Sequence, residues 1–213
     1  MKNFQIKVCG ITRERDAQLA ARFGADMLGF IFYKKSKRYI SATDAKKIIK
    51  KLPATIDRVG VFVDADFDSI LKTADRLKLD YVQLHGKQSN SIIRNLQKSG
   101  LKVISSFHIR TKSDYKKAAA SDADILQLDN STADKPGGTG RRFDWTIRPN
   151  TAIPNLMLSG GISADNVLEG IRIFDPIIVD VNSGVEILFG KKSEIRLKQF
   201  FSVCNRIRYG TKS

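Results

Sequence analysis

The chain has 213 residues, and 42% of them are hydrophobic, which is enough for one sizeable core. No composition shift or Pro-rich linker marks a second domain. Its 37 Lys and Arg against 22 Asp and Glu give a net charge of +15, which suits nucleic acid, an acidic membrane surface or an anionic substrate. The sequence starts without a signal-like segment and has no apolar run of membrane-spanning length, which argues against a secreted or membrane-spanning protein. Its two cysteines are too few for a disulfide framework, so a reducing cytoplasm is expected.

The basic residues occur as scattered pairs and lack interleaved aromatic residues or a nucleic-acid motif. We therefore interpret most of them as solvated helix faces and expect neither a nucleic-acid nor a membrane partner. Two clusters differ because each follows a predicted strand: residues 34–38 and the pair Arg141-Arg142.

Eight apolar runs of strand length recur along the chain, most of them followed by a helical stretch. The runs cover residues 6–9, 27–32, 59–63, 81–84, 103–107, 125–128, 156–158 and 177–181. Strands that alternate with helices pair in parallel, because each crossover helix returns the chain to the same edge. Eight such units predict an α/β fold, a closed (β/α)₈ barrel that forms a single domain over residues 1–213, with its active site at the carboxyl ends of the strands.

Helix signals fill most of the segments between these runs. Capping residues and apolar residues at helical spacing predict helices over 13–23 after Thr12, after Ser41 or Thr43, over 67–77 after Asp66, after Ser89, over 114–120, after Ser163, and over 193–207. Gly24 and Gly100 are expected to end the first and the fourth of these helices. A long polar loop over 130–142 follows the sixth strand instead.

Two glycine-containing turns follow the last two strands, at Ser159-Gly160-Gly161 and Asn182-Ser183-Gly184. Glycine lets backbone N–H groups approach a phosphate closely, and a phosphate site commonly forms at this place in barrels. The alternative is that these glycines only allow tight turns of the backbone. Two such turns after consecutive strands favour a phosphorylated small-molecule substrate.

Three residues at strand ends could carry chemistry. Cys9 precedes Gly10, and although most cysteines are inert core residues, cationic neighbours or backbone dipoles could make this thiol a base. Asp129 is expensive to desolvate, and it is either a carboxylate that holds a loop donor or a general acid with a raised pKa. Asp180 is assigned a supporting role that orders the turn beside it. Cys204, in the last predicted helix, belongs to the core.

His85 and His108 follow the fourth and fifth strands. A lone histidine is most often a local hydrogen-bonding residue, and neither has a carboxylate-spaced partner in sequence. No His-x-x-x-His or Cys-x-x-Cys pattern occurs, so we predict no metal site. No Gly-x-Ser-x-Gly motif occurs either, which argues against a serine nucleophile.

Together these segments resemble the phosphoribosylanthranilate isomerase family. The matches run in family order along essentially the whole chain: KVCGIT at 7–12, GAD at 24–26, LGF at 28–30, SKRY at 36–39, VGVF at 59–62, VQLHG at 82–86, LD at 128–129, GGTG at 137–140, FDW at 143–145, SGGI at 159–162 and DVNSGVE at 180–186.

The resemblance implies an Amadori rearrangement of N-(5-phosphoribosyl)anthranilate, carried out without a cofactor by a monomer or a homodimer. On this basis Asp129 is the general acid, Cys9 the general base, and Arg38 the arginine near the anthranilate. The phosphate-binding loops fall at Gly138, Gly160-Gly161 and Ser183-Gly184.

Several alternatives are weaker. A ribulose-phosphate epimerase should show metal-binding His and Asp at strand ends, and an indole-glycerol phosphate synthase should show a catalytic Lys there. A bifunctional histidine–tryptophan isomerase should have two Asp residues where this chain has Cys9 and Asp129. A basic barrel that binds nucleic acid would need neither of these residues.

Overall fold

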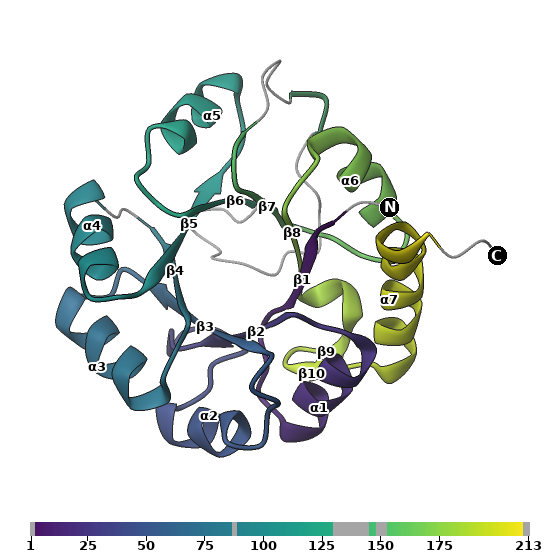
Figure 1. The fold of residues 1–213 in the computed structure, drawn as a ribbon, viewed down its shortest axis with the longest axis horizontal. Helices are drawn as coiled ribbons and strands as arrows, with labels where there is room; N and C mark the ends of the chain where they lie inside the picture. The colour runs from purple at the N-terminus through teal and green to yellow at the C-terminus, as the bar shows by residue number, and fades with distance from the viewer. Residues whose placement is uncertain (1–2, 87–88, 130–144, 148–152, 211–213) are drawn as a thin grey trace.

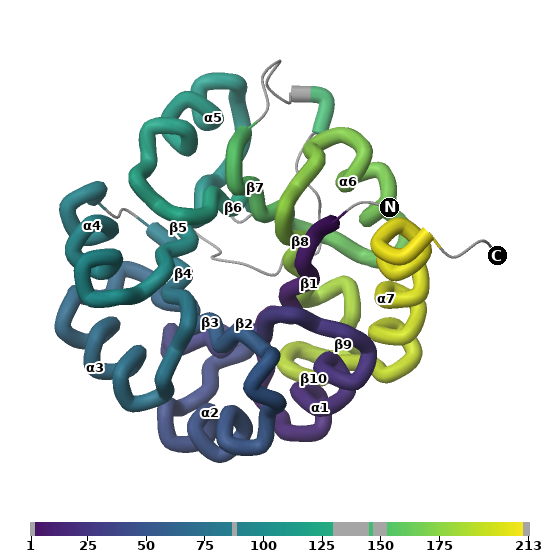
Figure 2. The backbone as a smooth tube through the Cα atoms, in the orientation of Figure 1, coloured from purple at the N-terminus to yellow at the C-terminus, as the bar shows by residue number. Residues whose placement is uncertain are grey.

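The structure is a computed structural model, and it describes residues 3–86, 89–129, 145–147 and 153–210. Eight parallel strands close into a barrel in chain order, as predicted (Figure 1). The strands are β1 Gln5–Val8, β2 Met27–Ile31, β3 Asp57–Val63, β4 Tyr81–His85, β5 Lys102–His108, β6 Ile125–Asp129, β7 Leu156–Leu158 and β8 Ile178–Val181. The ring closes where β1 pairs with β8 over its whole length (Figure 2).

The helices surround the ring of strands (Figure 1). They are α1 Glu14–Phe23, α2 Ala42–Ile49, α3 Phe67–Leu77, α4 Asn90–Lys98, α5 Lys112–Ala119, α6 Val167–Phe174 and α7 Glu194–Tyr209. Between β6 and β7 the described residues form a short 3₁₀ turn, η1 Trp145–Ile147. The predicted loop over 130–142, with Gly138 and the Arg141-Arg142 pair, lies outside the described residues. None of the helices in the described segments has the length and apolarity to cross a membrane.

The predicted helix starts are largely confirmed, with two corrections. The helix expected after Ser163 begins after Asn166 instead, as α6. Side-chain oxygens that accept a hydrogen bond from the first helical turn cap four helices, at Ser41, Asp66, Ser89 and Ser193. Thr12 does not cap α1, which begins after Arg13, because the Thr12 hydroxyl instead donates to the carbonyl of Gly190 at 2.6 Å. Gly24 ends α1 with a left-handed φ of 103°.

The last barrel strand leads into a feature that the apolar runs did not predict. A 3₁₀ turn, η2 Ser183–Val185, is followed by an antiparallel hairpin of β9 Glu186–Leu188 and β10 Lys191–Lys192. The bond from Thr12 to Gly190 attaches the hairpin to the segment that follows β1. The hairpin therefore lies beside the end of β1.

Apolar residues fill the barrel at its amino-terminal end. One buried cluster takes a residue from each of seven strands: Met27, Val59, Tyr81, Ile104, Ile125, Met157 and Ile178. The larger core cluster lies between the strands and the helices, and it includes Cys204, as predicted. Because side chains alternate along a strand, the residues two positions further along each strand also point inward and form the next layer.

Candidate active site

The layer above the apolar cluster is polar, and its residues are buried except for Ser106, which is partly exposed. Lys7 of β1 donates to Asp180 of β8 at 2.9 Å, and neither side chain reaches solvent appreciably. Gln127 of β6 donates to the second oxygen of the same carboxylate at 3.0 Å, and Gln83 of β4 donates to Gln127 at 2.7 Å. Ser106 of β5 also donates to Gln127. This polar layer, Lys7, Gln83, Ser106, Gln127 and Asp180, forms the floor of the barrel mouth.

Sequence reasoning missed most of this floor. Its residues interrupt runs that otherwise read as apolar strands, as in Tyr81-Val82-Gln83-Leu84. The available signal was the period of two, because Lys7 is two residues from Cys9 and Gln127 is two residues from Asp129. Asp180 belongs to the floor and pairs with Lys7, which places it below the turn it was expected to order.

Cys9 follows β1 directly and continues its ladder, since its N–H donates to the carbonyl of Val181 at 2.9 Å. The thiol is buried with 4% of its surface exposed. Burial and the charge of Asp180 raise its pKa, whereas the ammonium groups of Lys7 and Lys192 lower it, and Lys7 also hydrogen bonds to the sulfur. The cationic neighbours predicted for Cys9 are present, but burial outweighs them and the pKa is raised.

Asp129 ends β6, two positions beyond Gln127, and is half-buried. It lies opposite His108 in the β5–β6 register. Burial raises the pKa of Asp180, and the charge of Asp129 adds to this shift. The same charge opposes the burial that lowers the pKa of His108. Asp180 in turn acts on the pKa of Cys9. The predicted acid and base therefore share one electrostatic environment above the polar layer.

Arg38 is buried and forms a two-nitrogen ion pair with Glu186 of β9, with Nε at 2.9 Å and Nη2 at 2.6 Å from the carboxylate. Lys192 donates to the same carboxylate at 3.0 Å and to the side chain of Asn182 at 2.9 Å. Although burial opposes it, pairing with Arg38 and Lys192 lowers the pKa of Glu186. The sequence predicted Arg38 but neither of its ionic neighbours, because the hairpin that carries them was not predicted.

Gly10 brings this ionic group next to Cys9. A Cβ atom on Gly10 would lie 2.7 Å from Cδ of Arg38 and 2.7 Å from Oδ1 of Asn182. The residue also has a φ of +72°, which favours glycine. The turn after β1 therefore packs directly against the Arg38 and Asn182 side chains.

The two predicted phosphate turns are adjacent. Gly160 and Gly161 have φ angles of 82° and 72°, and Ser183 opens the 3₁₀ turn after β8. A Cβ atom on Gly184 would lie 2.0 Å from the carbonyl oxygen of Ile162, so the turns touch through backbone alone. Within the described part of the chain, the backbone N–H groups of Gly160 and Gly161 donate no hydrogen bond. These amides are available to an anion.

Both histidines have a nitrogen partner among the described residues. His85 lies 2.7 Å from the amide nitrogen of Gln83, and His108 accepts a hydrogen bond from Arg110 at 2.6 Å. Among residues 3–86, 89–129, 145–147 and 153–210, no cluster of three or more His, Cys, Asp or Glu side chains could hold a metal ion.

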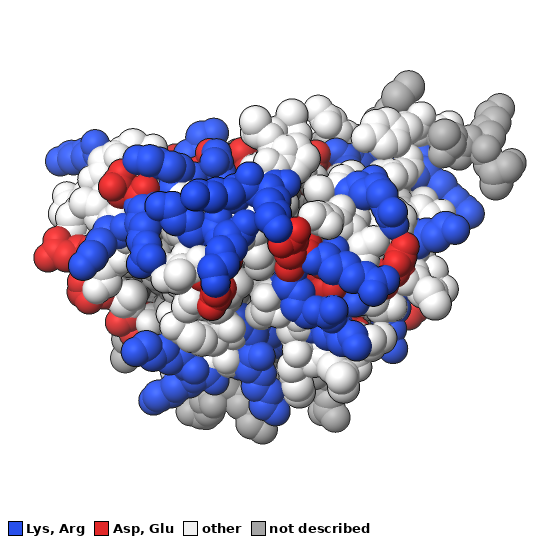
Figure 3. Space-filling model, turned by 90° about the horizontal axis from the view of Figure 1, so that it is seen from below, with Lys and Arg blue, Asp and Glu red and all other residues white. Residues whose placement is uncertain are grey.

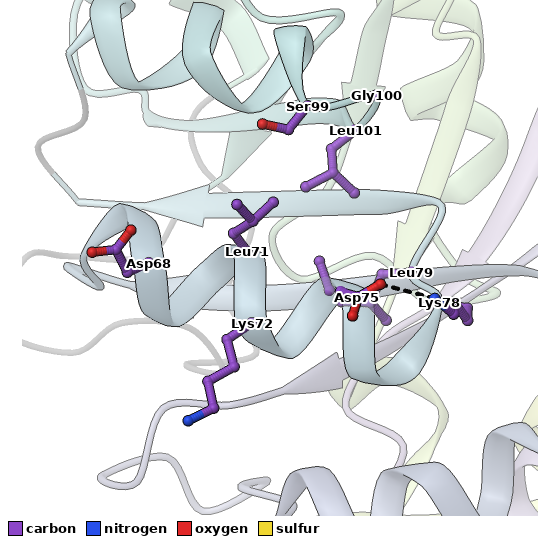
Figure 4. A pocket seen from close by; sticks show the side chains of 10 residues that line it. Asp68, Leu71, Lys72, Asp75, Lys78, Leu79, Ser99, Gly100 and Leu101 are labelled. Atoms are coloured by element: carbon purple, nitrogen blue, oxygen red, sulfur yellow. Dashed lines mark hydrogen bonds and ion pairs between the residues drawn. The ribbon is translucent and has the colours of Figure 1, made fainter.

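A surface pocket lies elsewhere on the molecule (Figure 4). Residues of α3 line it together with the turn between α4 and β5, and Asp75 and Lys78 form an ion pair at its edge. Its lining includes none of Cys9, Asp129 and Asp180. It is a groove between two neighbouring helices on the outside of the barrel.

Comparison with known proteins gives a consistent family. The model of the family described as N-(5'phosphoribosyl)anthranilate (PRA) isomerase matches residues 6–203. The N-(5'-phosphoribosyl)anthranilate isomerase of Acidithiobacillus ferrooxidans is 40% identical over 202 residues, which cover 94% of this chain and 97% of that protein.

Two solved structures extend the similarity to three dimensions. The phosphoribosyl anthranilate isomerase of Thermotoga maritima has a TM-score of 0.85 and 36% identity, over 98% of this chain and 100% of its own. A phosphoribosyl anthranilate isomerase in complex with reduced 1-(o-carboxyphenylamino)-1-deoxyribulose 5-phosphate has a TM-score of 0.82 and 34% identity, with the same coverage.

Proposed function

The chain belongs to the N-(5'-phosphoribosyl)anthranilate isomerase family, and we propose that Cys9 and Asp129 are the base and the acid of its reaction. The enzyme converts N-(5-phosphoribosyl)anthranilate into 1-(2-carboxyphenylamino)-1-deoxyribulose 5-phosphate, an Amadori rearrangement of tryptophan biosynthesis. The observation that carries the proposal is the placement of both residues above one polar layer, at the same end of the barrel.

In this mechanism Asp129 protonates the furanose ring oxygen and the C1–O bond breaks, which leaves an iminium ion. Cys9, as a thiolate, then removes the proton at C2 and produces an enolamine. Loss of the enol O–H proton and protonation of C1 yield the ketone. Two protons are added and two are removed, and C2 is oxidised as C1 is reduced, so the atoms and electrons balance within the substrate.

The Lys7 and Lys192 ammonium groups favour the thiolate that this step needs. A bound sugar also displaces water from the mouth, which strengthens both attractions because the dielectric screening falls. The protein thus has two buried cations within range of the proposed base.

Substrate binding is assigned to the phosphate turns and to Arg38. Gly160-Gly161 and Ser183-Gly184 would bind the phosphate through backbone N–H groups, with Gly138 as a third contributor. Arg38 would contact the carboxylate of the anthranilate. Glu186 occupies Nε and Nη2 of Arg38, and no described residue accepts from Nη1, so this nitrogen has hydrogen-bonding capacity to offer.

We further propose that residues 1–213 act as one domain in the cytoplasm, as a monomer or a homodimer. Both states are known for the isomerase of Thermotoga maritima, which is described as dimeric and of which generated monomers have a crystal structure.

The test is an assay of substrate fluorescence loss with the variants Cys9→Ser and Asp129→Asn. Each should lower kcat by at least ~10²-fold, since a positioned acid or base typically contributes that much. The control is Cys204→Ser, which changes the other cysteine, remote from the mouth, and should keep normal kcat. Unchanged circular dichroism would establish that the fold is intact. A Cys9→Ser or Asp129→Asn variant with near-normal kcat would remove that residue from the mechanism.

A further inference from the structure

The polar layer is a chain of hydrogen bonds whose direction one charged pair determines. Lys7 is fully buried 2.9 Å from Asp180, and an ammonium donates only, so the carboxylate accepts. The second carboxylate oxygen lies 3.0 Å from the Gln127 amide, which must therefore present its nitrogen. The Gln127 oxygen then points away from Asp180 and accepts from the next member of the chain.

Gln83 is the next member, and its orientation is fixed in turn. Its amide nitrogen lies 2.7 Å from the Gln127 oxygen, and a flipped amide would place two acceptors at that distance. The same nitrogen lies 2.7 Å from Nε2 of His85. The hydroxyl oxygen of Ser106 lies farther from this nitrogen, at 3.4 Å. An amide nitrogen has two hydrogens, so we assign them to the two nearer acceptors, Gln127 and His85.

The surroundings of the Gln83 side-chain oxygen are consistent with this orientation of the amide. Its Oε1 is buried and has no hydrogen-bond partner among the described residues. An unpaired buried acceptor is costly, but turning the amide to pair it would oppose Gln127. Thus the charge of Asp180 decides the orientation of both amides.

We propose that Asp180, through Gln127 and Gln83, fixes His85 as a neutral imidazole protonated on Nδ1. We propose also that this N–H donates to an oxygen of the ribose in the bound substrate. His85 is then a substrate-binding residue, and the two glutamines are positioning residues that act through it.

Two further observations support the assignment. Burial and the ammonium charge of Lys7 lower the pKa of His85 to about 4, while the charge of Asp180 acts in the opposite direction, so the ring is neutral at pH 7. His85 ends β4 and is partly exposed, and no described residue accepts a hydrogen bond from its Nδ1. Nδ1 can therefore donate to a bound ligand, while Nε2 is occupied by Gln83.

Ser106 offers a competing arrangement. Its hydroxyl lies 3.1 Å from Nε2 of His85 and could accept a hydrogen from it. That tautomer would bring the Nε2 hydrogen against a Gln83 N–H at the shorter distance of 2.7 Å. Removing Gln83 as a donor should therefore release the second tautomer, whereas removing Ser106 should not.

The experiment on the tautomer uses the free enzyme and ¹⁵N spectra of the imidazole rings. The chain has two histidines, so a His108→Gln variant identifies the His85 signals. At pH 7 the wild type and Ser106→Ala should show a protonated Nδ1 and a bare Nε2, and Gln83→Met should show protonated Nε2. An imidazolium, a protonated Nε2 in the wild type, or no change in Gln83→Met would overturn the proposal.

The second measurement rests on the proposed function, whereas the spectra do not, so the two can fail separately. In His85→Asn an amide N–H lies near the former Nδ1 position, and in His85→Gln it lies nearer Nε2. His85→Asn should retain roughly tenfold more kcat/KM than His85→Gln, about the contribution of one hydrogen bond. Equal losses in the two variants, or none, would exclude the substrate contact even if the tautomer is as proposed.

Discussion

At the scale of single residues, the charges around the proposed base form two separate groups. Lys7 has Asp180 as its partner, and Lys192 has Glu186 and Asn182. Both ammonium groups lower the pKa of the Cys9 thiol, but burial and the nearby carboxylate raise it. The resting thiol is therefore protonated, and the cations limit the cost of ionising it.

This balance predicts how Cys9 titrates. Because burial dominates, the midpoint of Cys9 alkylation by iodoacetamide should lie above the ordinary thiol pKa of about 8.5. Lys192→Met should move it further upward, since one of two favourable charges is lost. The measurement is the alkylation rate against pH in a Cys204→Ser background. A wild-type midpoint below the ordinary value, or one that Lys192→Met leaves unmoved, would contradict this account.

Arg38 gives a second prediction at this scale. Arg38→Ala should raise KM more than it lowers kcat, because the contact with the anthranilate carboxylate exists in the ground and transition states alike. It should also lower the melting temperature, since Glu186 keeps Lys192 but loses a buried partner. Arg38→Lys, which keeps the charge but not the two-nitrogen geometry, should give intermediate values of KM and melting temperature. A selective fall in kcat in Arg38→Ala would place Arg38 in the chemical step instead.

At the scale of elements, the turns after β7 and β8 act as one unit. Gly184 touches the Ile162 carbonyl, and the next residues continue into the β9–β10 hairpin that carries Glu186 and Lys192. The segment that forms the second phosphate turn thus continues into the hairpin whose Glu186 holds Arg38, the proposed carboxylate contact. Displacing either turn should disturb both ends of the substrate.

Gly184→Ala tests this unit. The added methyl group would lie 2.0 Å from the Ile162 oxygen, so the turns must separate. We expect a lower melting temperature and a KM raised at least about tenfold, the equivalent of one hydrogen bond. Gly24→Ala is the matched control, because its φ of 103° is strained but nothing lies within 4 Å of the new atom. It should reduce stability without changing KM, and an unchanged KM in both variants would reject the phosphate assignment.

The elements that sequence reasoning predicted are those with strong local signals. The eight apolar runs, the caps at Asp66 and Ser89 and the start of the last helix near Ser193 depend on neighbouring residues alone, and the structure confirms them. Thr12 has the same local signal, yet a partner 178 residues away takes its hydroxyl. Contacts between residues so far apart in the chain cannot be predicted from the local sequence pattern.

The candidate site divides in the same way. Cys9, Asp129 and the glycine turns were predicted because polar or glycine residues end apolar runs. The floor of Lys7, Gln83 and Gln127 was missed because each residue lies inside such a run and is satisfied only across strands. The hairpin was missed because its strands have three and two residues, too short for a periodic pattern.

At the scale of the whole molecule, the net charge of +15 is spread widely. Lys and Arg side chains clearly outnumber Asp and Glu on the face seen in Figure 3. A substrate with a phosphate and a carboxylate should be attracted to such a protein from a distance. This attraction differs from the short-range contacts of Arg38 and the glycine turns.

Ionic strength separates these two effects. The Debye length is about 10 Å at 0.1 M salt, so added salt screens the distant lysines more than the buried contacts. We expect kcat/KM to fall with rising salt while kcat changes little, provided that substrate capture limits the rate. Steady-state kinetics over a series of NaCl concentrations, with a viscogen to establish that capture is limiting, would measure it. A flat profile would mean that the charge excess has no role in catalysis.

The ion pair between Lys7 and Asp180 joins the first strand to the last, 173 residues apart. During synthesis the first seven strands emerge before the carboxylate that Lys7 requires. Until β8 arrives, a nascent barrel would have to bury an ammonium group without its counterion, which is strongly unfavourable. Ring closure is therefore coupled to the arrival of the carboxyl-terminal strand, and a ribosome-bound chain is expected to remain open until nearly all of it has emerged.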